Sequence, residues 1–461
     1  AVEAGWIDPD TDNSVHEVSS YIDGRKHSLV FSDEFNIDGR TFHDGNDPRW
    51  TAINKDDYTN YALHYYNHDL AQTSNGFLNI STIIEDIHYT FDDVINGQSK
   101  QIKTTKNYQS AMLQGWNKFC FTGGIVEISA RLPGQAYIGG LWPAMWMMGN
   151  LARATYVGSS NNIWPWSYDT CSKGKAQHQQ LFSACNSATH WGMLPHQGRG
   201  APEVDILEAM PGREVLVGTS TQKPYFSASY QVAPGKEDGY RPNPGETPVP
   251  ELWYSPDFLE YGPNTSLNIF FYGMHLAGVT PDKDYSADAL SGNRNLEPTH
   301  FDDQHVYRVE WKQGDEGYLQ WHLDGELVYH ISAAALNLTG AIIPEEPMYL
   351  LFNTAVSSTW GFPSPCPEDC PCTCFDCRDP ACACAVPANM CSNLPAHMLI
   401  DYVRVYQDSG DSNQTVGCST TTHPTAKYIE AHADVYKTKH DAVPLQKVTH
   451  GGGSCTVHSE C

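Results

Sequence analysis

Short runs of alternating apolar and polar residues recur along the chain and constrain its fold most strongly. Alternation places every second side chain on one face, which is the pattern of half-buried β-strands. The dipeptide Asp324-Gly325 between two such runs is typical of a tight hairpin turn. We therefore predict an all-β fold, an antiparallel β-sandwich of the jelly-roll kind with long loop insertions. The predicted strands lie at residues 28–32, 76–82, 124–131, 305–311, 318–324, 348–353 and 400–406.

The strand rhythm also suggests how the 461 residues are organised. All-β sandwiches often exceed 200 residues as one unit, so we expect one enlarged domain. Three stretches that break the rhythm read as insertions, because loops this long in a compact domain are usually functional rims or linkers. The prediction is an N-terminal extension (1–27), a jelly-roll domain (28–407) with insertions at about 150–200, 232–300 and the Cys-rich 362–396, and a C-terminal tail (408–461).

The formal charge of −26 limits the partners that the chain can attract. Nucleic acids and anionic membrane surfaces would repel it at long range, so we expect neither as a partner. A neutral polymer remains suitable. The 12 Trp, 25 Tyr and 16 Phe exceed what a core requires, and some of these rings are expected to line a surface groove.

Fourteen cysteines, eight of them between Cys366 and Cys391, indicate an oxidising compartment. Zinc binding by this cluster is the alternative, but local disulfides that staple a loop poor in apolar residues are the preferred interpretation. Cys171 and Cys185 would close the insertion at 150–200. Four glycosylation sequons agree with passage through the secretory pathway, to its lumen, the cell surface or the exterior; they begin at Asn79, Asn264, Asn337 and Asn413.

No run approaches the roughly 20 apolar residues that span a bilayer. We expect no membrane contact by this fragment and a monomer in solution. The chain begins at Ala1 without a Met or a leader, so a signal peptide or membrane anchor removed before this numbering is an open alternative.

Three acids stand within six residues in Glu203-Val-Asp205-Ile-Leu-Glu208. On a strand with strict alternation, Glu208 would face away from the other two, but one β-bulge near Ile206 and Leu207 returns it to their face. Crowded acids are electrostatically unfavourable, and a retaining glycosidase needs such a pair about 5–5.5 Å apart. Glu203 would then be the nucleophile and Glu208 the acid/base, with Asp205 setting their pKa values apart. The alternative is a solvated acidic edge strand.

The neighbouring motifs favour the catalytic interpretation. The acid strand follows Trp142-Pro-Ala-Met-Trp146, and this pair of motifs resembles glycoside hydrolase family 16. Further matches follow in order from about residue 28 to 407. The resemblance implies a concanavalin-like jelly roll and places Glu203, Asp205 and Glu208 as catalytic residues.

Within that family, the runs Gly198–Gly212, Trp164–Cys171, Phe35–Phe42 and Pro424–Ile429 resemble the Kre6/Skn1-like branch of β-1,6-glucan synthesis-associated proteins. That resemblance implies β-1,3- and β-1,6-linked glucans, of which laminarin is one, as polysaccharide or oligosaccharide partners. The usual N-terminal cytoplasmic and membrane segments of that branch do not appear here, and the Cys-rich insertion departs from its fungal members. The linkage made or cut stays open.

Aromatic rings stack on the apolar faces of sugars, which makes several Trp residues candidates for substrate binding. Asn353 could bond a sugar hydroxyl, although a buried Asn at a strand end is usually a satisfied structural group. Each Trp could equally belong to the core. The candidates for substrate binding are Trp142, Trp146, Trp164, Trp166, Asn353 and Trp360.

Three functions remain open at this point. A transglycosylase and an endo-β-glucanase share every step up to the glycosyl-enzyme and differ in whether a sugar hydroxyl or water attacks it. The extra aromatic insertions favour transfer with some hydrolysis. A glucan-binding or assembly protein without catalysis is the third candidate, although all three acids are present.

No cofactor is expected to be required. The resemblance places Glu34 and Asp401 where the fold often holds a structural Ca²⁺, and oxygen ligands suit that ion. Two solvated acids are the alternative. We predict no catalytic metal.

Overall fold

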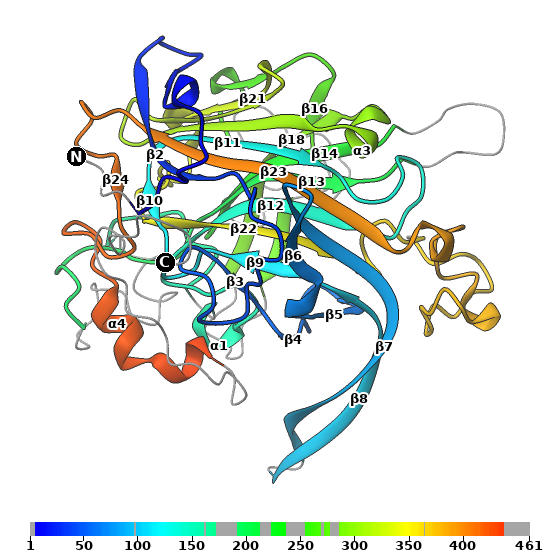
Figure 1. Cartoon of the computed structure of the whole chain (residues 1–461). Helices are drawn as coiled ribbons and strands as arrows, with labels where there is room; N and C mark the ends of the chain where they lie inside the picture. The colour runs from blue at the N-terminus through cyan, green and yellow to red at the C-terminus, as the bar shows by residue number, and fades with distance from the viewer. Residues whose placement is uncertain are drawn as a thin grey trace.

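Two large β-sheets form the architecture of the computed structural model (Figure 1). The structure describes residues 5–95, 98–160, 163–171, 191–212, 223–236, 254–268, 272–276, 285–363 and 365–437. Within these residues the pairings are antiparallel except for one short parallel pair, so the predicted all-β antiparallel sandwich is confirmed. The helices are short: α1 (Val157–Ser160), α3 (Thr299–Asp302) and α4 (Ala426–Ala431).

The larger sheet holds thirteen strands among the described residues, and the smaller one eleven. The larger comprises β1 (Glu17–Ser19), β2 (Lys26–Asp33), β4 (Lys55–Asp56), β5 (His64–Tyr66), β6 (Ala71–Ser74), β7 (Phe77–Ile95), β8 (Gln98–Ser110), β11 (Gly124–Arg131), β15 (Leu259–Tyr261), β19 (His305–Lys312), β20 (Tyr318–Leu323), β21 (Glu326–Ser332) and β23 (Ala396–Gln407). The smaller comprises β3 (Thr51–Ala52), β9 (Met112–Gln114), β10 (Phe121–Thr122), β12 (Trp142–Gly149), β13 (Glu203–Met210), β14 (Tyr225–Val232), β16 (Thr265–Leu267), β17 (Tyr272–Leu276), β18 (Tyr285–Asn295), β22 (Met348–Ala355) and β24 (Thr415–Val416).

The core lies between the two sheets, because inward-facing side chains of both belong to one buried cluster. Val126 and Val403 come from the larger sheet, and Met147, Val204 and Phe352 from the smaller. Each of the predicted strand runs lies within or largely within an observed strand. The hairpin turn is also confirmed: Asp324 and Gly325 join β20 to β21 with φ values of 50° and 82°, as a turn with two left-handed central residues requires.

One insertion differs from its prediction. The stretch 232–300 was expected to interrupt the strands, yet β18 within it pairs with β14 along its length and extends the smaller sheet. Its residues Ala287, Ala289, Ser291 and Gly292 are small, and apart from Tyr285 at its start the run lacks the β-branched and aromatic residues that mark a strand in sequence. The neighbouring sheet, not the local pattern, specifies this strand.

The segments outside residues 28–407 contact the sandwich. Trp6 belongs to the main core cluster, and β1 pairs with β2. Beyond β23, Cys418 forms a disulfide with Cys120, and Tyr436 stacks on Trp116 at 5.1 Å. The boundaries assigned to the domain from sequence stay a prediction.

The Cys-rich stretch is stapled locally, as predicted. Four disulfides join its eight cysteines, and no described cysteine is free. Cys171 is disulfide-bonded too, whereas Cys185 lies outside the described residues, so that pairing stays a prediction. The local disulfides are Cys366–Cys372, Cys370–Cys384, Cys374–Cys382 and Cys377–Cys391.

Replacing both Cys120 and Cys418 by Ala should destabilise the protein more than replacing Cys366 and Cys372. The first disulfide closes a span of 298 residues and the second a span of 6. Loop-closure entropy then predicts losses of about 6 and about 2 kcal/mol, respectively. Guanidinium unfolding of both double variants under non-reducing conditions measures this, and an equal loss in the two would contradict it.

Candidate active site

The three acids lie on β13, near the middle of the smaller sheet, between β12 and β14 (Figure 1). Asp205 pairs with Ser229 and Glu208 with Ser227, so two residues of β13 oppose one residue of β14. The two bulged residues are Ile206 and Leu207, both buried in the core cluster. The predicted bulge is present, and it returns Glu208 to the face that carries the other two acids.

A side chain from the opposite sheet bonds the backbone at the bulge. The indole N–H of Trp321, on β20, donates to the carbonyl oxygen of Asp205 at 2.9 Å, and the Trp ring is buried. A bulge interrupts ladder hydrogen bonds, and a buried carbonyl without a partner costs free energy. Trp321 therefore stabilises the irregular backbone on which the acids depend.

Both glutamates accept a hydrogen bond from a tryptophan. Trp164 donates to Glu203 Oε2 at 2.6 Å, and Trp142 donates to Glu208 Oε1 at 3.1 Å. The remaining oxygen of Glu208, Oε2, is buried and has no hydrogen-bond partner among the described residues. Each tryptophan thus orients one carboxyl group, and Glu208 keeps one oxygen for a ligand.

Asp205 is the most buried of the three acids, at 1% exposure against 8% for each glutamate. Its Oδ2 accepts a hydrogen bond from Gln231 Nε2 at 3.1 Å, and its side chain is hydrogen-bonded to Glu203. Burial raises the pKa of Asp205 to about 6, and it raises the pKa of Glu203 and of Glu208 well above the usual range. Neighbouring negative charge adds to the shift in both glutamates.

These shifts mean that the row does not carry three charges at neutral pH. Burial disfavours the ionised form of each acid. Two carboxyl groups at hydrogen-bonding distance are also not both ionised, because the two negative charges would repel each other. Glu203 and Asp205 therefore share a proton as a coupled pair. Burial likewise favours the protonated form of Glu208, which is the form that a general acid needs.

The predicted substrate-binding residues divide into three groups: those beside the two glutamates, a pair one strand away, and one buried ring. Trp142 stacks on Trp360 with ring centroids 4.6 Å apart and an angle of 15°, and Trp360 donates to the carbonyl of Ala209 at 3.1 Å. These two rings lie beside Glu208. Trp164 lies at Glu203.

Trp146 and Asn353 form a second pair, since the Trp146 indole donates to Asn353 Oδ1 at 2.8 Å. The strand register places Asn353 opposite Ala144, which is itself opposite Glu208. Asn353 thus shares the face of the acids, with its oxygen already bonded within the protein.

Trp166 does not join this group. It is 2% exposed, belongs to the core cluster, and donates to the carbonyl of Tyr168 at 3.0 Å. A ring with no open face cannot stack on a sugar, so the sequence-based assignment of Trp166 to substrate binding is replaced by a structural role.

Sequence reasoning missed Gln231 and Trp321. Each contacts Asp205 from a different strand, and neither lies in a recognisable motif. Gln231 lies on β14 two residues from Ser229, which pairs with Asp205. The alternation of that strand could therefore have placed Gln231 on the face of the acids. Trp321 belongs to the other sheet, and no local pattern signals its contact.

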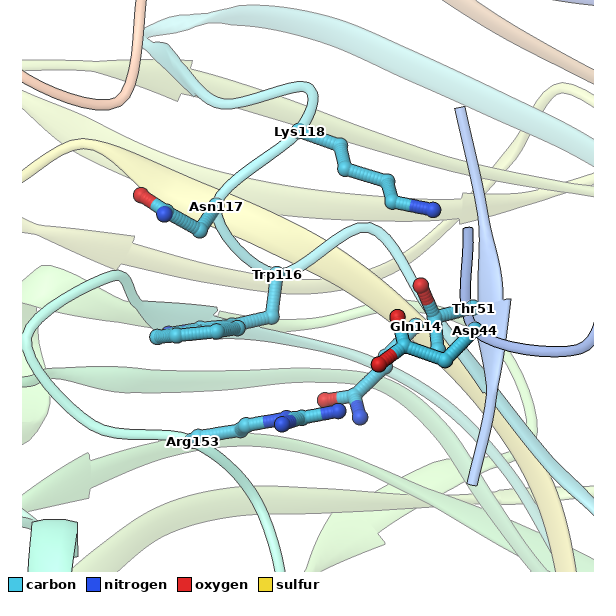
Figure 2. A pocket seen from close by; sticks show the side chains of 7 residues that line it. All are labelled: Asp44, Thr51, Gln114, Trp116, Asn117, Lys118 and Arg153. Carbon is cyan, nitrogen blue, oxygen red and sulfur yellow. The ribbon is translucent and has the colours of Figure 1, made fainter. Parts of the chain in front are cut away.

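A separate pocket lies farther along the smaller sheet and contains none of the acids (Figure 2). Gln114, on β9, stands opposite Leu351 of β22, which stands opposite Trp146 of β12. Three strand spacings, roughly 14 Å, therefore separate it from β13. Its lining consists of Asp44, Thr51, Gln114, Trp116, Asn117, Lys118 and Arg153.

The two acids considered for Ca²⁺ have protein partners. Both carboxylate oxygens of Glu34 bond Arg404, at 2.9 and 2.7 Å, and Oε1 also accepts from Thr11. Asp401 accepts from Ser129 at 3.4 Å. The Ca²⁺ site stays a prediction.

Comparison with known proteins identifies the family. The sequence pattern described as Beta-glucan synthesis-associated protein SKN1/KRE6/Sbg1 matches residues 1–366 and 385–446. The chain belongs to this family. It is 31% identical to the Beta-glucan synthesis-associated protein KRE6 of Saccharomyces cerevisiae over 95% of this chain and 54% of that protein, and 32% identical to SKN1 of Candida albicans over 99% and 55%. The chain thus spans about half the length of these curated relatives.

Two weaker similarities concern glucanases. A Glucan endo-1,3-beta-glucosidase A1 of Niallia circulans is 31% identical over 117 residues, which are 24% of this chain and 13% of that protein. The laminarinase catalytic domain of Thermotoga maritima superposes with a TM-score of 0.44 at 20% identity, covering 83% of this chain and 98% of that one.

No described helix has the length and apolar character to cross a bilayer. The disulfides indicate maturation outside the reducing cytosol. Members of this family are associated with β-glucan synthesis by their common description.

The pH dependence of folding tests the buried acid row. Between about pH 4 and 6 the native Asp205 binds a proton that the unfolded chain has lost, so stability should fall as pH rises through that window, by up to about 1.4 kcal/mol per pH unit. The glutamates, with pKa values raised from 4.5, should extend the decline to higher pH.

Asp205→Asn should remove the part of this decline that lies between pH 4 and 6. Thermal midpoints measured across that range compare the variant with the parent and with Asp257→Asn, an exposed aspartate. If Asp205→Asn keeps the slope of the parent, the row is not protonated as described.

Proposed function

We propose that the chain is a retaining β-glucan-active enzyme that transfers glycosyl groups onto glucan acceptors, with hydrolysis as a side reaction. The observation that carries the proposal is the bulged strand with two buried glutamates, each held by a tryptophan N–H. A fold gains no stability from burying three adjacent acids, whereas double displacement at a glycosidic carbon uses such a set.

In the first step Glu203 attacks the anomeric carbon as its carboxylate, and Glu208 gives its proton to the departing glycosidic oxygen. The bond from the anomeric carbon to that oxygen breaks as the bond to Glu203 forms. Positive charge develops at the sugar and favours ionised Glu203, so the proton that it shares with Asp205 passes to Asp205. Trp164 stabilises the resulting carboxylate by its hydrogen bond.

In the second step Glu208, now ionised, removes a proton from the incoming hydroxyl group, and that oxygen displaces Glu203. A sugar hydroxyl yields a longer glucan, and water yields hydrolysis. The stacked pair of Trp142 and Trp360 lies beside Glu208, where an acceptor sugar would approach. The description of the family as associated with synthesis also supports transfer.

An endo-β-1,3-glucanase is the second candidate, favoured by the local similarity to the Niallia circulans enzyme. Both candidates use the same intermediate. The products show whether the enzyme acts on β-1,3 or β-1,6 linkages, so the assay must determine the linkage of each product.

The test incubates the protein with laminari- and gentio-oligosaccharides and resolves the products by size and linkage. Products longer than the substrate are the expected outcome. Shorter products alone would favour the glucanase, and binding without turnover would favour a glucan-binding or assembly protein.

Glu203→Gln should abolish turnover while leaving glucan binding largely intact, and Glu208→Gln should lower turnover by about 10²–10⁴-fold, as expected for loss of a general acid. Glu85→Gln, an exposed glutamate on β7, is the matched control. Unchanged turnover in Glu203→Gln would reject the mechanism.

Trp321→Phe should lower turnover by about 10–100-fold and shift its pH profile, because the backbone that carries Asp205 loses its support. Trp311→Phe is the matched control: Trp311 is also buried and donates to a backbone carbonyl, that of Pro344, at 2.9 Å. Both variants should lose similar stability. A pH profile that moves equally in both, or in neither, would make Trp321 merely structural.

A further inference from the structure

Strands β7 and β8 form a two-stranded arm that curves away from the sandwich (Figure 1). Among the described strands, none other pairs with β7 beyond Thr82 or with β8 before Tyr108. Two strands alone are at best marginally stable in water, because neither of their faces is covered. The arm would therefore gain stability from a partner on one of its faces.

Aromatic rings follow one another along one face of the arm. Tyr89 and Phe91 are two residues apart on β7, so they share this face. Phe91 pairs with Ile102 of β8 and is 42% exposed. The ring centroid of Tyr89 lies 6.4 Å from that of Phe91 and 5.3 Å from that of Tyr65 on β5. The three rings thus lead from the arm back to its base.

The loop between β4 and β5 carries two more rings at this base. Tyr58 and Tyr61 are 63% and 75% exposed, the two highest values among the large hydrophobic side chains described. The hydroxyl group of Tyr89 is hydrogen-bonded to Asp56, which lies two residues before Tyr58. The loop therefore continues the row of rings that begins on the arm.

The same loop is fixed against the segment that carries Trp360. The N–H of Ser358 donates to the carbonyl oxygen of Tyr61 at 3.3 Å, and Ser357 Oγ donates to the carbonyl oxygen of Asn60 at 2.6 Å. Trp360 follows two residues after Ser358 and stacks on the tryptophan that bonds Glu208. The row of rings thus ends next to the acid row.

Tyr61 is exposed in a conformation that opposes folding. Its φ of 53° lies in the left-handed region, which costs a bulky residue about 1–2 kcal/mol. Core packing does not repay this cost, because the side chain is largely in solvent. A ligand that uses the ring explains why the conformation is kept.

We propose that this row of rings binds a β-glucan chain and extends the acid row on the side of Trp360. The inference rests on the proposed function and adds a surface that holds the polymer outside the reacting sugars. Aromatic rings stack on the apolar faces of sugars, and the formal charge of −26 favours a neutral polymer. The row consists of Tyr58, Tyr61, Tyr65, Tyr89 and Phe91.

The chemistry of the row suits a sugar polymer better than an apolar protein segment. Polar groups separate the rings, among them the ion pair of Lys106 with Asp56, so no single large apolar patch forms. A glucan offers both apolar faces and hydroxyl groups to such a surface. A chain held there would stay near the acid row between reactions, because its next binding event is intramolecular.

The test measures the dissociation constants of laminarin and laminaritetraose by calorimetry, with Glu203→Gln as the parent to prevent turnover. The double variant Tyr89→Thr/Phe91→Thr should weaken laminarin binding about 10-fold relative to laminaritetraose, because only the long chain reaches the arm. His88→Thr/Thr90→Ser changes the opposite face of the same strand and is the matched control. It should keep the ratio of the parent.

Tyr61→Asn supplies a second readout. Asn adopts the left-handed conformation at lower cost, so the thermal midpoint should stay the same or rise while laminarin binding weakens. A merely structural Tyr61 would lower the midpoint when replaced.

The outcomes separate this inference from the proposed function. An unchanged ratio in Tyr89→Thr/Phe91→Thr would overturn the inference and leave a protein segment as the occupant of the face. The proposed function would then stand if the unaltered chain still elongates laminari-oligosaccharides. Failure of the parent to bind either glucan would overturn both.

Discussion

The bulge at Ile206 and Leu207 is the constraint on which the site depends. Alternation along β13 would otherwise separate Glu208 from Glu203 and Asp205 by the thickness of the sheet. The bulge sends both apolar residues into the core, so the irregular backbone is held by packing rather than by the ladder. Trp321 completes this arrangement from the opposite sheet, which makes the sandwich itself part of the site.

Burying three acids beside one another opposes folding, and the protein limits this cost in two ways. Raised pKa values favour the protonated forms of these acids, so fewer charges are desolvated than three ionised carboxylates would require. Indole and amide N–H groups satisfy particular oxygens, as Trp164, Trp142 and Gln231 do. Among the described residues, Glu208 Oε2 is buried without such a partner, and the proposed mechanism directs this oxygen at the substrate.

Features encoded locally could be predicted from the sequence. Alternation located the strands, Asp324-Gly325 located a turn, and the spacing of the three acids required the bulge. Features set by distant partners could not be. The small residues of β18 form a strand because they pair with β14, and Cys120 forms a disulfide with Cys418, 298 residues away.

Tryptophan shows the same division within the site. Composition and motif marked five of these residues as ligands for sugar, yet an indole is both a stacking surface and a hydrogen-bond donor, and sequence does not separate the two roles. Trp164 and Trp142 donate hydrogen bonds to the glutamates, and Trp166 is buried in the core.

The position of Trp142 connects these roles to the fate of the glycosyl-enzyme. Its N–H bonds Glu208 while its ring lies against Trp360, so the residue that orients the proposed acid/base also forms the surface beside it. A sugar bound against that surface would displace water from Glu208 and present its own hydroxyl for deprotonation. Acceptor binding and activation would then depend on the same side chain, which is a physical route by which a hydrolytic site comes to favour transfer.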